Sequence, residues 1–149
     1  MKPTAAIFDV DGTLCDVRTA RHHVMKHPKD FDAFHEAAAA CPPHRHVVAA
    51  ARRHQAAGDA ILVVTARKRR WERATSMWLA LNNIPSDALY MRGDRDQRKD
   101  VEVKRDILAR IRRRFDVVHA YDDNPNVIGL WRAERIPVTV VPGWDEAAG

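Results

Sequence analysis

The sequence predicts an α/β fold, a Rossmann-like three-layer arrangement around a sheet of about five parallel strands. Three observations support this prediction. The chain has 149 residues, 46% of them hydrophobic, which suits a single domain over residues 1–149 with a sizeable core. Five short apolar runs are continuous rather than alternating, as in strands buried on both faces of a parallel sheet. Helical patterns separate most of these runs, and such alternation is typical of α/β folds.

The expected strands are the five apolar runs, Thr4–Asp9, Ala60–Val64, Ala88–Met91, Val117–Tyr121 and Val138–Val141. Apolar residues recur at helical spacing in four segments: 44–58 before the second expected strand, 69–83 before the third, 100–115 before the fourth and 125–135 before the fifth. Gly58 and Pro137 suit the ends of two of these helices. Three tryptophans fall within helical patterns, so we expect core positions for them rather than a role in stacking on nucleic-acid bases: Trp71, Trp78 and Trp131.

One long segment does not fit simple alternation. About fifty residues separate the first and second expected strands, too many for a single crossover helix. Residues 30–41 are expected to form an additional helix, and 16–46 as a whole is interpreted as a small insertion above the C-terminal edge of the sheet. Open α/β folds bind ligands at that edge. The insertion is therefore either a lid or specificity loop, or a surface elaboration.

The charge balance is basic, with 25 Lys and Arg against 20 Asp and Glu and a formal net charge of +5. Basic residues cluster at 66–73 and at 110–114. Such clusters would attract a phosphate-rich partner, although solvated helix faces explain either cluster equally well.

Other features argue against several protein classes. No apolar stretch is long enough to span a bilayer and no signal-peptide segment opens the chain, so we expect a cytoplasmic protein with no membrane partner. Cys15 and Cys41 form neither a metal-type cluster nor a disulfide framework and are expected to be free thiols. The eight histidines show no zinc-type spacing, so no metal role is expected for them.

Candidate chemistry begins at the end of the first strand. Asp9 stands at its tip, and the alternation of side chains brings Asp11 back to the same side. Gly12 permits a sharp turn and Thr13 can fix the loop by a local hydrogen bond. Two carboxylates on one side can hold a divalent cation, or divide the work of nucleophile and general acid/base.

Matching groups follow other elements. Thr65 and Arg67 come at the end of the second strand, where they offer a hydroxyl and a guanidinium suited to phosphate. Asp122 and Asp123 follow the fourth strand, and Lys104 lies on the helix before it. Ligands of open α/β folds bind at the carboxyl ends of the strands, so these groups form one specific constellation.

These residues resemble the four motifs of the haloacid dehalogenase (HAD) superfamily of phosphotransferases. The first motif, DxDGT, is matched by residues 9–13, and the second, a Ser or Thr that closes a strand, by Thr65. The third is matched by Lys104, and the acidic pair of the fourth by Asp122 and Asp123. All four occur in order and cover nearly the whole chain. The resemblance implies a HAD fold with a small insertion, or minimal cap, after the first strand.

A narrower resemblance is to the 3′-phosphatase domain of phage-type polynucleotide kinase/phosphatases. It rests on "IFDVDGTL", "VVTAR", "MRGDRDQRKDVEVK" and "FDVVHAYDDNPNVIGLWR". That subfamily has an Arg two residues after the second motif, as Arg67 is here, and an Asp four before the motif Lys, as Asp100 is. Its Arg shortly after the first motif corresponds to Arg18. No GxxxxGKS/T phosphate-binding loop occurs, so the resemblance implies a stand-alone phosphatase or one domain of a longer chain, with a kinase domain or a ligase as a possible partner.

The resemblance also implies a mechanism. Asp9 attacks phosphorus and forms an aspartyl-phosphate, while Asp11 protonates the leaving oxygen and then activates water. Asp11 would begin protonated and Asp9 ionised. Mg²⁺ would be held by Asp9, the backbone carbonyl of Asp11 and Asp123, with Asp122 in support.

Phosphoryl oxygens and the rest of the substrate would be held by further side chains. Thr65 and Lys104 contact the phosphoryl group in this scheme, and the substrate-binding residues are Thr13, Arg18, Arg67 and Asp100. The function implied is a magnesium-dependent phosphomonoesterase that removes 3′-phosphates from nucleic-acid ends. The alternatives are a phosphatase of free nucleotides or other small phosphomonoesters, and a non-catalytic module that binds nucleic acid or phosphate.

Overall fold

The computed structural model describes residues 1–25 and 28–142. Its centre is a five-stranded sheet in the order β3-β2-β1-β4-β5, in which all neighbouring strands are parallel. The strands are β1 (Thr4–Phe8), β2 (Ala60–Lys68), β3 (Ala88–Arg92), β4 (Asp116–Asp122) and β5 (Val138–Val140). The predicted α/β class and parallel sheet are confirmed.

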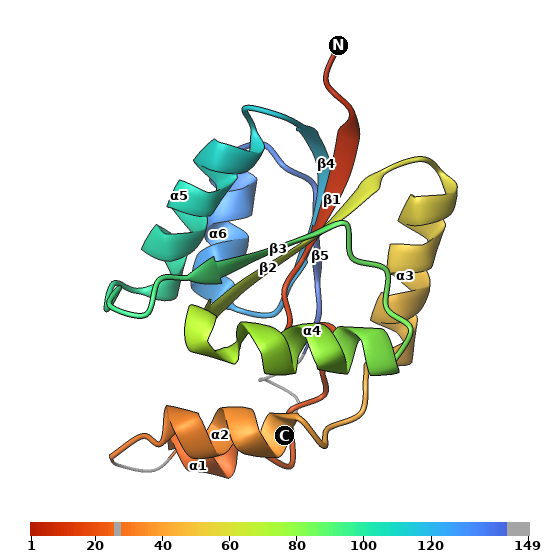
Figure 1. Ribbon diagram of the computed structural model, residues 1–149. Helices are drawn as coiled ribbons and strands as arrows, with labels where there is room; N and C mark the ends of the chain where they lie inside the picture. The colour runs from red at the N-terminus through yellow and green to blue at the C-terminus, as the bar shows by residue number, and fades with distance from the viewer. Residues whose placement is uncertain (26–27, 143–149) are drawn as a thin grey trace.

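Helices cover both faces of the sheet, which gives three layers (Figure 1). One face carries α3 (Arg45–Ala56) and α4 (Glu72–Leu81), the latter preceded by the short 3-10 helix η1 (Arg69–Trp71). The other face carries α5 (Asp100–Ile111) and α6 (Pro125–Ala133). No helix in the described part of the chain is long and apolar enough to cross a membrane.

The side-chain alternation of β1 divides the core into two halves. Ala6 and Phe8 point into the cluster under α3 and α4, whereas Ala5 and Ile7 point into the cluster under α5 and α6. All four side chains are fully buried, as the continuous apolar run predicts. β1 is therefore held on both faces, and the loop that leaves its carboxyl end starts from a rigid support.

The insertion between β1 and α3 contains α1 (His22–Met25) and α2 (Phe31–Ala38). Figure 1 shows both helices beyond the carboxyl ends of the strands, on the side where α4 also lies. Asp30 caps α2 by accepting a hydrogen bond from the backbone N–H of Ala33 at 2.9 Å. The small insertion predicted after the first strand is thus present. Its helix α1 has no counterpart among the predicted helices, and residues 26–27 lie outside the described residues.

Three details differ from the predictions. β2 continues to Lys68 instead of ending at Val64. Its pairing with β3 is interrupted after Val64 and resumes between Lys68 and Arg92. β5 lies at the edge of the sheet and is largely exposed, so it is not buried on both faces. Trp78 and Trp131 are core residues as predicted, but Trp71 is only half-buried and belongs to neither core cluster.

Candidate active site

A tight loop follows β1 and presents the first two aspartates. The backbone N–H of Asp9 donates to the carbonyl of Tyr121 on β4 at 3.1 Å, so the sheet ladder fixes the position of Asp9. The chain then reverses through Gly12, whose φ of 82° is one that other residues rarely adopt. The amides of Thr13 and Cys15 both donate to the carbonyl of Val10, at 3.1 and 2.8 Å.

Lys104 joins two of the carboxylates at the base of the site. Its Nζ donates to Asp9 Oδ1 and to Asp122 Oδ2, each at 2.9 Å, and its side chain is only 3% exposed. Burial tends to lower the pKa of this ammonium, but the charges of Asp122 and Asp9 outweigh burial and raise it. Lys104 therefore stays charged and fixes the orientation of Asp9.

The two carboxylates of the acidic pair have different surroundings. Asp122 Oδ1 accepts the backbone N–H groups of Asp123 and Asn124 at 2.9 and 3.1 Å, and Lys104 occupies Oδ2. Asp123 Oδ1 lies 3.3 Å from the Thr13 hydroxyl, but Asp123 Oδ2 is buried and has no hydrogen-bond partner among the described residues. Asp122 thus supports the site, and Asp123 presents an unpaired oxygen to it.

The residues fit a divalent cation. Asp9, Asp122 and Asp123 each offer a carboxylate oxygen, and the three atoms lie within 4.8 Å of one another. Burial and the charge of Asp122 raise the pKa of Asp9 to about 7, and burial and the charge of Asp9 raise the pKa of Asp123 to about 10. A hard cation would supply the positive charge that these carboxylates lack and would satisfy the unpaired oxygen of Asp123.

Asp11 faces away from this cluster and pairs with Arg67. The guanidinium donates twice to the carboxylate, from Nε at 2.9 Å and from Nη2 at 2.5 Å, and its Nη1 donates to the buried Thr75 hydroxyl at 3.0 Å. Burial raises the pKa of Asp11, but the adjacent Arg67 charge outweighs burial and the pKa lies below its usual value. The pair with Arg67 therefore favours the ionised form of Asp11, whereas the implied mechanism begins with Asp11 protonated.

The two threonines of the motifs are both buried at the site. The Thr13 hydroxyl donates to Asp9 Oδ2 at 3.1 Å, which holds the second carboxylate oxygen opposite Lys104. Thr65 lies inside β2, not after it, and its hydroxyl accepts the backbone N–H of Arg67 at 3.1 Å. Thr65 lines the same cavity as Asp9 and Lys104.

Arg92 is a site residue that sequence reasoning missed. It ends β3, is 8% exposed, and its Nη2 donates to Asp100 Oδ1 at 2.7 Å. Its Nε donates to the carbonyl of Ala66 at 2.9 Å, so the guanidinium ties β3, β2 and α5 together at the cavity wall. Its position in the sequence was the signal that could have found it, because Arg92 ends an apolar strand and the other motif residues also lie at the carboxyl ends of strands.

Asp100 and Arg18, both predicted to bind substrate, have different positions. Asp100 lies in the first turn of α5 and lines the cavity beside Arg92. Arg18 is not among the described residues that line the cavity, and its exposed guanidinium pairs with Asp16 at 2.6 Å. The structure thus brings Asp100 to the site and leaves Arg18 outside it.

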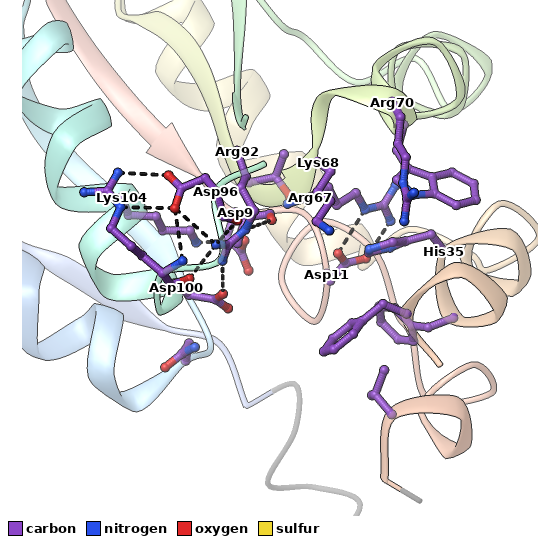
Figure 2. Close-up of a pocket in the computed structure, with 18 of the residues that line it drawn as sticks. Asp9, Asp11, His35, Arg67, Lys68, Arg70, Arg92, Asp96, Asp100 and Lys104 are labelled. Atoms are coloured by element: carbon purple, nitrogen blue, oxygen red, sulfur yellow. Dashed lines mark hydrogen bonds and ion pairs between the residues drawn. The ribbon is translucent and has the colours of Figure 1, made fainter. Parts of the chain in front are cut away.

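The cavity has a volume of about 360 Å³ and lies between the strand ends and the insertion. Figure 2 shows Lys104, Asp9 and Asp100 on one side of it, and Asp11, Arg67 and His35 on the other. His35 comes from α2, and burial lowers its pKa to about 4, so the ring is neutral near pH 7. The volume of the cavity is large enough to hold a phosphate ester together with part of its leaving group.

An aspartate held by a buried lysine, with a second aspartate and an acidic pair beside it at the carboxyl ends of a parallel sheet, defines a phosphatase of the HAD type. The model of the polynucleotide kinase PNKP phosphatase domain matches residues 3–143, and the chain belongs to this family. No curated protein matches the sequence.

Solved structures agree with this assignment. A chain of the Pnkp1/Rnl/Hen1 RNA repair complex is 26% identical with a TM-score of 0.80, over 94% of this chain and 42% of that one. The Class C acid phosphatase from Bacillus anthracis with tungstate bound is 14% identical with a TM-score of 0.70, over 97% of this chain and 69% of that one. This second likeness shows the fold alone. The chain spans less than half the length of the repair-complex chain that it matches.

Proposed function

We propose that the chain is a magnesium-dependent phosphomonoesterase that forms an aspartyl-phosphate on Asp9 and removes 3′-phosphates from nucleic-acid ends. The observation that carries this proposal is the setting of Asp9. Its two oxygens contact Lys104 and Thr13, and the unpaired oxygen of Asp123 lies beside it. The carboxylate is thereby oriented at the base of a cavity in which a phosphorus atom could be attacked in line.

The chemistry can be assigned to side chains of this chain. Asp9 attacks phosphorus, and Lys104 and Thr65 stabilise charge on the transferred phosphoryl oxygens. In the proposed reaction the substrate phosphate replaces Asp11 as the partner of Arg67. Once the guanidinium has left, burial raises the pKa of Asp11 and the carboxylate takes up a proton from the solvent. Asp11 then gives this proton to the leaving oxygen and, in the second half-reaction, takes one from the attacking water.

Asp9, Asp123 and the backbone carbonyl of Asp11 would hold Mg²⁺, which would supply positive charge at the phosphoryl group. Asp122 acts indirectly in this proposal, because its carboxylate accepts hydrogen bonds from Lys104, Trp131 and the backbone of residues 123–124. Its role is to position Lys104 and the turn that presents Asp123.

Support for a nucleic-acid end as substrate comes from the family and from the rim of the cavity. Lys68, Arg70 and Arg98 all line the cavity, where Arg70 pairs with Asp32 and Arg98 with Asp96. The phosphates of a polyanion can replace these carboxylates as partners of the cations. The similarity to a chain of an RNA repair complex supports the further proposal that a kinase or a ligase acts together with this phosphatase. The insertion favours a second candidate, a phosphatase of free nucleotides, because Phe31, Phe34 and His35 of α2 wall the cavity.

Phosphate release with Mg²⁺ tests the proposal. The substrates are an oligonucleotide with a 3′-phosphate, the same oligonucleotide with a 5′-phosphate, a 3′-mononucleotide and an aryl phosphate. We expect preferential release from the 3′-phosphorylated oligonucleotide, loss of release in Asp9→Asn, and transfer of labelled phosphate to the wild-type chain only. Faster turnover of the mononucleotide would support the second candidate, and undiminished activity of Asp9→Asn would refute Asp9 as the nucleophile.

A further inference from the structure

The outer half of the cavity differs from its base. The base is built of charged groups and hydroxyls, whereas the outer half is walled by four aromatic side chains, here called the aromatic wall: Phe31, Phe34, His35 and Trp71. The first three come from α2 of the insertion, and Trp71 comes from η1, which lies between β2 and α4. The proposed phosphoryl chemistry uses none of these rings.

The aromatic wall is a built feature and not a chance exposure of one side chain. The rings of His35 and Trp71 pack at 5.3 Å between centroids, and the ring of Phe34 packs edge-on against His35 at 5.2 Å. Figure 2 shows His35 beside the Asp11–Arg67 pair, so the aromatic wall lies next to the residues proposed to act on the phosphate. Phe31 extends the wall outward and is 54% exposed although its side chain is large and apolar.

Two polar ring atoms in the wall have no hydrogen-bond partner among the described residues. They are Trp71 Nε1 and His35 Nδ1, both buried. Buried ring nitrogens are usually hydrogen-bonded, and an unpaired one calls for an explanation such as a missing ligand. A ligand suited to this place is flat and uncharged, and it carries polar atoms on its edge.

Resting on the proposed phosphatase function, we propose that the aromatic wall binds the terminal nucleobase of the substrate, stacked on its rings. A nucleobase has both properties: its π face can stack on one ring of the wall, such as the exposed Phe31, while its polar edge meets the in-plane nitrogen of a different ring. Arg70 and Lys68 also line the cavity, and Figure 2 shows both near Arg67. They can meet the next phosphate of the strand once it replaces Asp32 as the partner of Arg70. The insertion is thereby assigned a role in specificity, while the base of the cavity does the chemistry.

A pair of substrates isolates the contribution of the base. One oligonucleotide ends in an ordinary nucleotide 3′-phosphate, and the other ends in an abasic residue with the same 3′-phosphate. We expect the wild-type enzyme to prefer the first by about tenfold or more in kcat/KM, mostly through KM, which is the scale of one base–aromatic stack.

Variants then locate the effect. Trp71→Leu and Phe31→Ala should bring the ratio of the two kcat/KM values close to one, whereas Trp71→Phe should keep most of the preference. Met77→Ala is the matched control, because Met77 on α4 is also 54% exposed and does not line the cavity. Phe31→Ala removes an exposed side chain, so it decides the matter even where Trp71→Leu fails to fold. A fluorescent base analogue at the 3′ end, bound to Asp9→Asn, should be quenched by stacking and lose that quenching in Asp9→Asn/Phe31→Ala.

The outcomes separate the two proposals. Equal turnover of both oligonucleotides by the wild-type enzyme, or a preference that survives in both Trp71→Leu and Phe31→Ala, would overturn the nucleobase site and leave the phosphatase proposal standing. Release of phosphate from neither oligonucleotide would overturn the proposed substrate, and the nucleobase site with it.

Discussion

Lys104→Met tests the energetics of the buried charge cluster. The substitution keeps much of the side-chain volume but removes the ammonium that contacts Asp9 and Asp122. At 2.9 Å and an effective dielectric constant of about 20, each contact corresponds to about 6 kcal/mol of Coulomb attraction. Removing the ammonium also removes its own desolvation penalty of several kcal/mol. We expect a net loss of about 3–5 kcal/mol in the free energy of unfolding, the range for breaking a buried ion pair on one side.

The sign of the pH dependence follows from Asp9. Its pKa is already raised to about 7, and without Lys104 it rises further. A carboxyl whose pKa is higher in the folded than in the unfolded chain contributes stability at low pH that is lost as the pH rises through the folded pKa. The loss caused by Lys104→Met should therefore be larger near pH 8 than near pH 5, where Asp9 is protonated in both proteins.

Urea denaturation of metal-free protein at these two pH values measures the effect. Arg105→Met is the matched control, because Arg105 is an exposed cation on the same helix, and it should change stability by less than about 0.5 kcal/mol. If Lys104→Met costs no more than Arg105→Met near pH 8, the ammonium does not neutralise this cluster and the reasoning is wrong.

Three further predictions concern the same site. Asp123→Asn should stabilise the metal-free protein by about 1–3 kcal/mol near pH 8, because a neutral amide avoids the cost of protonating, on folding, a carboxyl whose pKa rises to about 10. The substitution should also abolish the rise in Tm on adding Mg²⁺, and an equal rise in both proteins, measured calorimetrically, would refute the metal assignment. The free energy of unfolding of the metal-free wild type should fall between about pH 4 and pH 10, because Asp9 and Asp123 lose their protons at higher pH in the folded chain than in the unfolded chain. Excess Mg²⁺ should make this fall smaller, as measured by urea denaturation. A free energy of unfolding that rises over this range would contradict the raised pKa values. Arg67→Lys keeps the charge but loses the paired contact to Asp11, so kcat/KM should fall about 10- to 100-fold. Arg69 is exposed, so Arg69→Lys is the control and should keep the wild-type kcat/KM. Equal kcat/KM values for Arg67→Lys and the wild type in a steady-state assay would count against a role for the guanidinium.

The insertion is the part of the chain where sequence reasoning left two readings open. Its helix α2 forms much of the outer cavity wall, so a pure surface elaboration does not describe it. Sequence patterns gave Trp71 a core position because it falls at helical spacing. In the structure it lies in η1, before α4 begins, and its ring turns to His35 instead of the sheet. The 3-10 helix has 3.0 residues per turn instead of 3.6, so a residue before the start of α4 leaves the face that α-helical spacing predicts for it.

Local patterns in the sequence determined the fold and most of the candidate site. Period-two and helical spacing are properties of short segments, so the order of strands and helices followed from them. The parallel sheet then brings the carboxyl ends of its strands to one edge, which is why Asp9, Thr65 and Asp123 could be assigned to one site before any contact was known.

Only the tertiary structure decided which partner each charged group takes. Arg67 lies 56 residues from Asp11, and no local signal predicts that its guanidinium pairs with that carboxylate instead of remaining open for phosphate. The unpaired oxygen of Asp123 and the lysine bridge from Asp9 to Asp122 likewise depend on side chains that meet only when β1, β4 and α5 are packed. Such contacts are fixed by burial, where each charge must find a partner, and burial is a property of the folded chain and not of a sequence window.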